Sequence, residues 1–390
     1  MTLRRFTILS LLGSVSSLQL LGPSRSFHRG EVTRFSPRTT LSRKLPASRQ
    51  DEMEIAPSSQ VPTYRGLWEF TRPHTLIGSA LCVPAIHAFA IPSGAPLFTA
   101  RLFQSCVWAL IPALFINIYI TGLNQITDVE IDRVNKPYLP LAAGHLTMPE
   151  AKWVVGLSLL AGLALGFLHP CSTFPLRMTL VLSALIGTFY SLEPFRLKRF
   201  PFFAALCILT VRGAVINIGF YGHAVQNLGL DVTAQNALAS PVIRKILSTL
   251  PFESAKCGLA TLFFALFGTV IALMKDVPDV VGDKLYGIKS LTVRLGPERV
   301  FTIARDALCL LMGVTGGALA ATGALLVFSQ GVVGRGLLRV IVGASSLLIA
   351  RTLKTMSCRV DTADQGQVYQ FYMFVWKVFY ASYILLPFVR

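Results

Sequence analysis

Nine apolar runs of about twenty residues recur along this chain of 390 residues, separated by polar connections. A run of that length is what an α-helix needs to cross the hydrocarbon core of a bilayer, where backbone groups must bond within the segment. Only 14% of the residues are charged, against roughly 25% in soluble domains. The sequence therefore predicts an all-α polytopic membrane bundle of nine transmembrane helices. The expected spans are 74–92, 102–122, 152–168, 174–192, 201–222, 257–274, 301–328, 336–355 and 369–389.

The N-terminal segment has the composition of a targeting peptide. Basic residues at Arg4 and Arg5 precede a short apolar stretch that ends near Leu21, as in a secretory signal. Residues 22–50 are rich in Ser, Thr, Arg and Pro, which is typical of organelle transit peptides. Together they predict a plastid protein that arrives through the secretory route; a plain mitochondrial or plastid transit peptide is the alternative. We expect a disordered targeting segment over 1–55 and a membrane domain over 56–390.

The net charge of +17 would ordinarily raise nucleic acid as a partner. Residues 1–50, however, carry nine Lys and Arg against one acid, Glu31, and so account for +8 of that charge. The remaining charge is ordinary for the loops of a membrane protein, and we expect the bilayer, not nucleic acid, as a partner. The sequence is silent on protein partners. The seven cysteines have no metal-ligand spacing, and we interpret them as buried thiols.

Nine spans place the connections after the second, fourth, sixth and eighth on the same membrane face as the mature N-terminus. Most Lys and Arg residues of the connections fall on that face, and so do the acidic motifs. By the positive-inside rule this face points toward the cytosol or, in a plastid membrane, toward the stroma.

The first acidic motif follows the second span and reads NQITDVEID from Asn124 to Asp132. We expect the spacing of four to place Asn124, Asp128 and Asp132 on one helical face, about 6 Å apart per step. Carboxylate and amide oxygens suit Mg²⁺, which also takes substrate phosphates as ligands. Alone, the motif is equally typical of acids that solvate a helix end.

A second acidic motif, KDVPDVVGDK, runs from Lys275 to Lys284 after the sixth span and contributes Asp276, Asp279 and Asp283. Because the topology places both motifs on one face, their acids would repel one another at the membrane edge unless cations neutralise them. A metal site to which both motifs contribute ligands explains the pattern. We expect Pro278 to interrupt the helix and Gly282 to leave room for a ligand.

Basic residues accompany these acids and could hold a diphosphate, since Arg offers a forked donor and Lys a point charge. They are Arg72, Arg133, Lys136, Arg196, Lys198 and Arg199, with Tyr190 as a further donor. Each is also a residue type that anchors helix ends at lipid headgroups. A metal–diphosphate site above apolar helices implies an isoprenyl diphosphate, whose allylic bond Mg²⁺ would help to ionise before an electron-rich acceptor attacks.

These motifs resemble the UbiA superfamily of intramembrane prenyltransferases, within it the homogentisate prenyltransferases. The resemblance covers residues 66–390 and rests on RPHT from Arg72, NQITDVEIDRVNKPYLPLAAG from Asn124, YSLEPFRLKR from Tyr190, KDVPDVVGDKLYGIKSLTVRLG from Lys275 and the C-terminal FYMFVWKVFYASYILLPF. It implies Mg²⁺ held by Asn124, Asp128, Asp132, Asp279 and Asp283, with Asp276 as a further metal candidate, and diphosphate contacts from Arg72, Lys136, Tyr190, Lys198 and Lys275.

The resemblance also implies the acceptor, homogentisate, which is prenylated on carbon and loses its carboxylate as CO₂. The donor's length stays open, because KLYGIKSLTVRLG resembles the phytyl enzymes while VRGAVINIGF resembles the solanesyl ones; we favour phytyl. Geranylgeranyl is a third donor. Alternative functions are prenylation of 4-hydroxybenzoate, dihydroxynaphthoate or chlorophyllide, or cation-coupled transport. Transporters usually place such charges near the bilayer midplane, whereas these acids lie at expected helix ends.

Overall fold

The computed structural model describes residues 63–93, 95–230, 254–288 and 290–390. The predicted targeting segment, 1–55, and the boundary at residue 56 lie outside the described residues.

Within the described residues, nine helices are long and apolar enough to cross a membrane, which confirms the predicted spans. The described part of the chain contains no β-strand. The spans are α3 Pro73–Ala90, α4 Ala100–Thr127, α6 Met148–Leu168, α7 Phe174–Ser191, a continuous segment Pro201–Leu228, α11 Ala255–Asp276, α14 Pro297–Gln330, α15 Val333–Ser357, and Gln365–Val389. The fifth joins α8 Pro201–Ile208, the π-helix η5 Leu209–Val215 and α9 Ile216–Leu228; the ninth joins α16 Gln365–Leu385 and η7 Leu386–Val389.

Local sequence explains where several spans begin. The hydroxyls of Thr99, Thr173 and Ser254 each accept a backbone N–H of the helix that follows. Thr147 and Glu150 form a capping box at the start of α6. These side chains satisfy backbone donors that the first turn of a helix leaves without partners.

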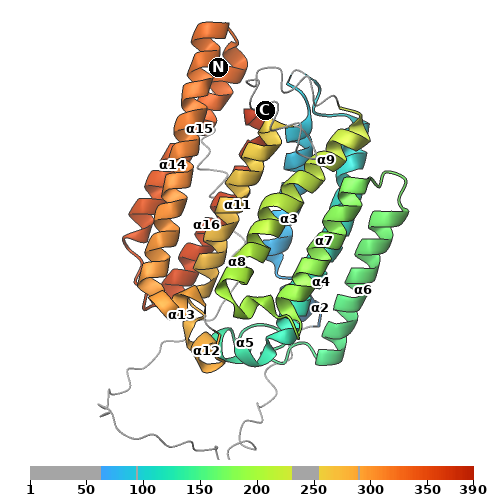
Figure 1. Ribbon diagram of the computed structural model, residues 1–390, viewed down its shortest axis with the longest axis vertical. Coiled ribbons are helices and arrows are strands. Elements are labelled where there is room, and N and C mark those ends of the chain that lie inside the picture. The colour runs from blue at the N-terminus through green and yellow to red at the C-terminus, as the bar shows by residue number, and fades with distance from the viewer. Residues whose placement is uncertain (1–62, 94, 231–253, 289) are drawn as a thin grey trace, which may run out of the picture. The chain divides into compact units, whose positions relative to one another are not determined.

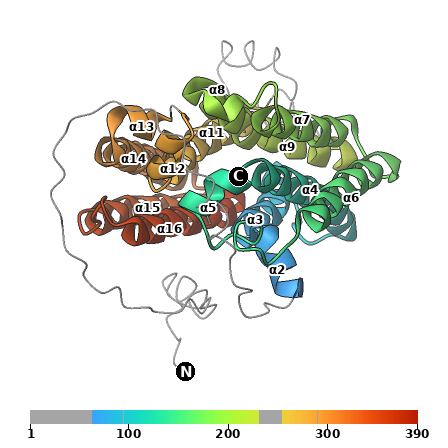
Figure 2. The ribbon, with the colours of Figure 1, turned by 90° about the horizontal axis from the view of Figure 1, so that it is seen from below.

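Six spans form a closed ring around a cavity. Contacts run from α3 to α4, from α4 to α7, from α7 to the segment η5–α9, from there to α11, from α11 to α16, and back to α3. Figure 2 shows this arrangement in the view along the helices. An aromatic cluster fills the side of the ring between α11 and α16, where Phe264 stacks on Tyr383 at 3.8 Å between ring centroids. Packed side chains of the six spans form the walls of the cavity.

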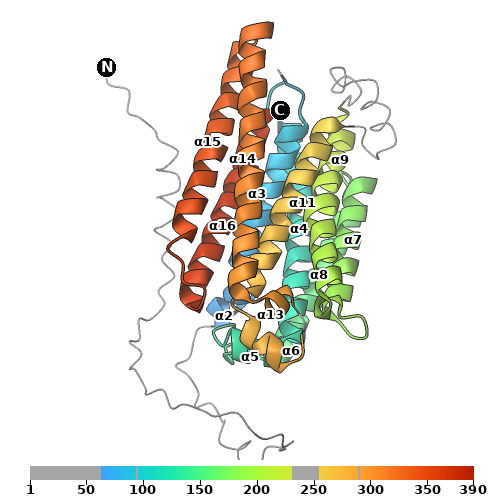
Figure 3. The same ribbon diagram turned by 60° about the vertical axis from the view of Figure 1, so that its left-hand side comes forward.

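The other three spans pack outside this ring. Helix α6 lies against α4 and α7, and the hairpin of α14 and α15 lies against α11 and α16 (Figure 3). The hairpin packs closely because glycines meet across it: a Cβ atom on Gly316 would lie 2.8 Å from the carbonyl oxygen of Gly343. The cavity walls therefore come from the ring alone.

Short helices connect the spans at one end of the bundle. They are α5 Val129–Asn135, η4 Leu197–Arg199, α12 Val280–Leu285 and α13 Leu291–Leu295, and α5, α12 and α13 lie together at the lower end in Figure 1. Hydrogen bonds join the connections there: Arg196 donates to the carbonyl of Thr127, and Gln365 to that of Pro278. The expectation that both acidic motifs share one face is confirmed.

Candidate active site

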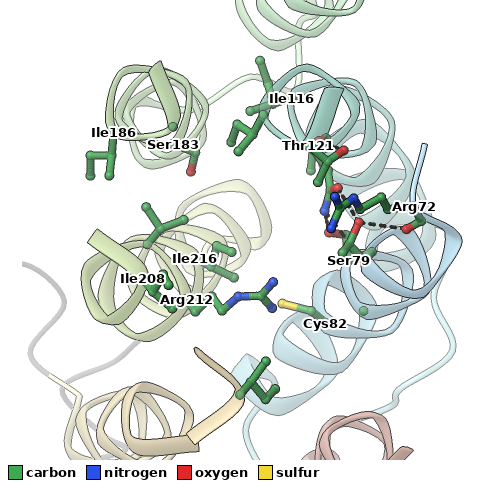
Figure 4. Close-up of a pocket in the computed structure, with 18 of the residues that line it drawn as sticks. Arg72, Ser79, Cys82, Ile116, Thr121, Ser183, Ile186, Ile208, Arg212 and Ile216 are labelled. Carbon is green, nitrogen blue, oxygen red and sulfur yellow. Dashed lines mark hydrogen bonds between the residues drawn. The ribbon is translucent and has the colours of Figure 1, made fainter. Parts of the chain in front are cut away.

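The ring of helices encloses a cavity of about 260 Å³ that opens beside the acidic motifs. Arg72, Asn124, Tyr190 and Lys275 line its mouth, and the ends of α3, α4, α7 and α11 bring them there. Deeper walls carry Ile116, Leu180 and Phe220, with Tyr372 and Trp376 along α16. Figure 4 shows isoleucines of α4, α7 and α8 across the cavity from the polar groups of α3. A polar mouth above a mainly apolar chamber, which Arg212 also lines, suits a ligand with a charged head and an apolar tail.

The first acidic motif is not one continuous helical stripe. Helix α4 ends at Thr127, Asp128 has a non-helical backbone (φ −113°, ψ 10°), and α5 begins at Val129. The break turns Asp128 toward Arg196 and Lys198, whose side-chain nitrogens lie 3.1 and 2.6 Å from Asp128 Oδ1. Asn124 Nδ2 donates to Asp128 Oδ2 at 3.1 Å. The expectation of a single straight stripe is therefore wrong, although Asn124 and Asp128 do meet.

The second motif is interrupted at Pro278, as expected, because α11 ends at Asp276 and α12 begins at Val280. Lys136, four residues after the first motif, forms an ion pair with Asp279 of the second. The expectation that Gly282 leaves space for a ligand is wrong. Asn135 Oδ1 accepts the backbone N–H of Gly282 at 2.8 Å, and a Cβ atom at Gly282 would lie 2.4 Å from that oxygen.

These acids share one electrostatic environment. Asp132, Asp279 and Asp283 are each 7% exposed. Burial raises the pKa of Asp132 to about 6; Lys136 and Arg72 oppose the rise, and the negative charges of Asp128 and Asp279 add to it. Burial also raises the pKa of Asp283 to about 7, with a Ser290 hydrogen bond opposing it and the nearby Asp276 and Asp279 adding to it. Burial is therefore the main cause of both raised pKa values, and the neighbouring carboxylates add to it.

A divalent cation fits this donor set. All the donors are hard oxygens, which Mg²⁺ prefers. Asp279 Oδ1 is buried and has no hydrogen-bond partner among the described residues, so one carboxylate oxygen is free to bind a cation. In the described part of the chain, no three His, Cys, Asp or Glu side chains converge on a metal position. Lys136 and Lys198 instead neutralise Asp279 and Asp128.

The five candidate diphosphate residues divide into two groups. Arg72, Tyr190 and Lys275 line the cavity mouth, where Lys275 Nζ lies 3.5 Å from the hydroxyl of Tyr190. Lys136 and Lys198 are bound to the acids and do not line the cavity. Burial lowers the pKa of Lys198 to about 8, although its bond to Asp128 favours the charged form. Only the first group reaches the cavity in this structure.

Arg72 at the cavity mouth and Arg196, which pairs with Asp128, have an unusual backbone. Arg72 and Arg196 are the non-glycine residues with positive φ (51° and 33°) in the described part of the chain. Such conformations cost of order 1–3 kcal/mol and cluster at functional sites. Arg72 Nε is also buried without a hydrogen-bond partner. Both arginines are thus held in place by the surrounding fold.

Two residues of the site and cavity, Asn135 and Arg212, were not predicted from the sequence. Asn135 lies within the DRVNKP stretch, but only the structure reveals its bond to Gly282. Arg212 lies inside the fifth span and lines the cavity. A charged residue near the middle of an apolar span is itself a signal of function, and it would have pointed to Arg212.

Comparison with known proteins agrees with this geometry. Residues 81–378 match the model of the UbiA prenyltransferase family. The chain is 34% identical to homogentisate phytyltransferase 1, chloroplastic, of Arabidopsis thaliana, covering 97% of this chain and 86% of that protein. It is 37% identical to homogentisate geranylgeranyltransferase of Triticum aestivum, covering 84% and 72%.

Among solved structures, the fold resembles that of a UbiA homologue from Archaeoglobus fulgidus bound to GPP and Mg²⁺. The TM-score is 0.50 at 17% identity, with 83% of this chain and 99% of the other covered. That likeness concerns the fold alone. The family match and the identities to the two plant enzymes show that this chain belongs to the UbiA prenyltransferase family.

Proposed function

We propose that this protein transfers a prenyl group from an isoprenyl diphosphate to homogentisate, with loss of the acceptor's carboxylate. The observation that carries the proposal is the cavity whose mouth brings Arg72, Tyr190 and Lys275 beside the two acidic motifs. The acceptor follows from the named relatives, which are homogentisate phytyl- and geranylgeranyltransferases. The reaction belongs to tocopherol or plastoquinone biosynthesis.

The metal in this proposal is Mg²⁺, bound by side chains of both motifs: Asn124, Asp128, Asp132, Asp276, Asp279 and Asp283. When bound, Mg²⁺ supplies a Lewis acid that withdraws electron density from the diphosphate. The unpartnered oxygen of Asp279 and the buried carboxyls of Asp132 and Asp283 beside it support a cation there. Lys136 and Lys198 would then be free to turn toward the diphosphate.

The chain's own residues perform the remaining tasks. Arg72, Tyr190 and Lys275 bind the diphosphate and stabilise its charge as the allylic C–O bond breaks. The chamber holds the tail and excludes water from the developing cation. A new C–C bond forms to the ring. The ring carbon releases one proton, the benzylic carbon takes one up as CO₂ departs, and no further reactant is needed.

We further propose that the protein is a multi-pass protein of a plastid membrane with its site facing the stroma. The leader composition and the name of the Arabidopsis relative, "chloroplastic", support the plastid. The excess of Lys and Arg at the end that carries the acids supports the orientation. The division of the chain into a targeting segment, 1–55, and a membrane domain, 56–390, remains part of this proposal.

The test is an assay of the purified protein in proteoliposomes with Mg²⁺. Phytyl, geranylgeranyl and solanesyl diphosphates are each offered with homogentisate, 4-hydroxybenzoate, dihydroxynaphthoate or chlorophyllide. We expect prenylated methylquinol from homogentisate alone, with phytyl or geranylgeranyl as the preferred donor. Prenylation of another acceptor at a higher rate than homogentisate would refute the proposal.

A further inference from the structure

Arg212 places a positive charge deep in the membrane domain. It lies near the middle of the fifth span, Pro201–Leu228, far from both ends. A charge at such depth is costly and is retained where it faces a cavity, a partner or a ligand. Arg212 lines the cavity described above.

The backbone around Arg212 has a specific local structure, which directs the side chain toward the cavity. Leu209–Val215 is a π-helix, a feature that is rare and frequent at functional sites. Asn217 Nδ2 donates to the carbonyls of Arg212 and Gly213, at 2.8 Å each. A Cβ atom at Gly213 would lie 2.3 Å from that of Ala265 on α11. The close contact at Gly213 and the bonds from Asn217 fix the turn that carries Arg212.

The guanidinium has no acidic partner. Its central carbon lies 4.8 Å from the centroid of the Trp376 ring, but no ion pair joins Arg212 to a carboxylate among the described residues. The residues that line the cavity include Arg72, Lys275 and Arg212, and no Asp or Glu. An aromatic face offsets only part of the free-energy cost of burying a cation. The positively charged lining of the cavity therefore favours anionic ligands.

Arg212 is separated from the diphosphate candidates at the mouth. Figure 4 shows its guanidinium directed toward Cys82 of α3. Cys82 follows Arg72 by ten residues along that helix, which is roughly 15 Å at 1.5 Å per residue. Arg212 thus meets the cavity about three helical turns deeper than Arg72, which begins α3 at the mouth. The cavity therefore has two positions for anions, one at the mouth and one at Arg212.

We propose that Arg212 binds the carboxylate of the aromatic acceptor and so orients its ring between the mouth and the chamber. This inference rests on the proposed function, in which the acceptor, homogentisate, is a carboxylate. The planar guanidinium matches a carboxylate with two parallel hydrogen bonds. With the carboxylate at Arg212, the ring lies toward the mouth, where the allylic carbon is released. The apolar side formed by Ile116 and Ile186 is left for the prenyl tail.

The experiment compares two ligands on variant proteins in nanodiscs. Binding of homogentisate and of its uncharged methyl ester is measured by calorimetry for the wild type, Arg212→Gln and Arg212→Lys. The wild type should bind homogentisate about 10- to 150-fold more tightly than the ester, as expected for a charge-assisted bond. Arg212→Gln should remove that preference and leave the Kd for geranylgeranyl diphosphate unchanged. Arg212→Lys, which keeps the charge but not the fork, should keep part of the preference.

Arg339→Gln is the matched control, since Arg339 lies within the span α15 and does not line the cavity. It should keep the full preference for homogentisate. The inference is overturned if the wild type does not distinguish the two ligands or if Arg212→Gln still does. It is also overturned if Arg212→Gln weakens geranylgeranyl diphosphate binding equally. If Arg212→Gln does not fold, as judged by its melting temperature, then Arg212→Lys decides: an unchanged or an absent preference overturns the inference, and a partial one supports it.

Binding and turnover separate this inference from the proposed function. A wild-type protein that binds homogentisate through Arg212 but does not prenylate it would refute the function and uphold the role of Arg212. A protein that prenylates homogentisate while Arg212→Gln keeps the preference would do the reverse.

Discussion

The acidic side chains of the site differ in whether a basic side chain pairs with them. Asp128 is held by Arg196 and Lys198, and Asp279 by Lys136. Asp132 and Asp283 are buried and lack such a direct ion pair among the described residues. That these acids and bases lie together on one face was predictable, because metal and diphosphate chemistry needs both. The pairing was not, because it depends on side-chain directions that spacing alone does not fix.

Metal binding should depend on pH through these two carboxyls. Their pKa values are raised to about 6 for Asp132 and about 7 for Asp283, so Asp132 loses its charge as the pH falls through 6 and Asp283 as it falls through 7. Protons compete with the metal for the same oxygens. The affinity for Mg²⁺ should therefore be highest at pH 8 and fall as the pH is lowered through 7 and then 6.

Calorimetric titration of the protein with Mg²⁺ and geranylgeranyl diphosphate at pH 8, 7 and 6 measures this dependence. Asp283→Asn should bind Mg²⁺ more weakly at pH 8 and lose the part of the pH dependence centred near 7. An affinity that is constant from pH 6 to pH 8 would show that neither carboxyl binds the metal as an anion.

Among the elements, the short helices α5 and α12 connect the two acidic motifs. Asn135 at the end of α5 accepts the N–H of Gly282 in α12, and the hydroxyl of Tyr286 donates to the carbonyl of Glu130 at 3.1 Å. The sequence predicted the long spans well, since apolar runs end at polar residues. It missed the break at Asp128, because nothing in NQITDVEID is a strong helix breaker. It also missed the π-helix Leu209–Val215, a rare conformation.

Removing the Asn135 side chain should separate the two acidic motifs. Asn135→Ala leaves the buried N–H of Gly282 without its acceptor, which costs about 1–3 kcal/mol. We expect a lower melting temperature and a weaker affinity for Mg²⁺. Thermal unfolding and calorimetry of the purified protein measure the two effects.

Asn227→Ala is the control for this variant. Asn227 Nδ2 donates to the carbonyl of Cys171 at 2.8 Å, away from the acidic motifs. Its loss should lower the melting temperature but leave the Mg²⁺ affinity unchanged. Equal effects of both variants on the metal would mean that Asn135 contributes only general stability.

Across the membrane domain, the six-span ring places one polar mouth over one apolar chamber. The number of spans and the side on which the acids lie were predictable, because hydropathy and the alternation of connections fix both. The order in which the spans pack around the cavity was not. It depends on contacts such as that of α16 with α3, which joins the two ends of the membrane domain. The sequence likewise did not reveal that Arg212 and Trp376 meet inside it.

Release of CO₂ from carboxyl-labelled homogentisate by the purified protein tests the central claim most directly. With Mg²⁺ and phytyl or geranylgeranyl diphosphate present, we expect labelled CO₂ in step with prenylated product. Chelation of the metal should abolish both, and Asp128→Ala or Asp279→Ala should lower both by about 10²-fold or more. CO₂ or product formed at an undiminished rate without the metal, or by both variants, would contradict the claim that the two acidic motifs form one metal–diphosphate site.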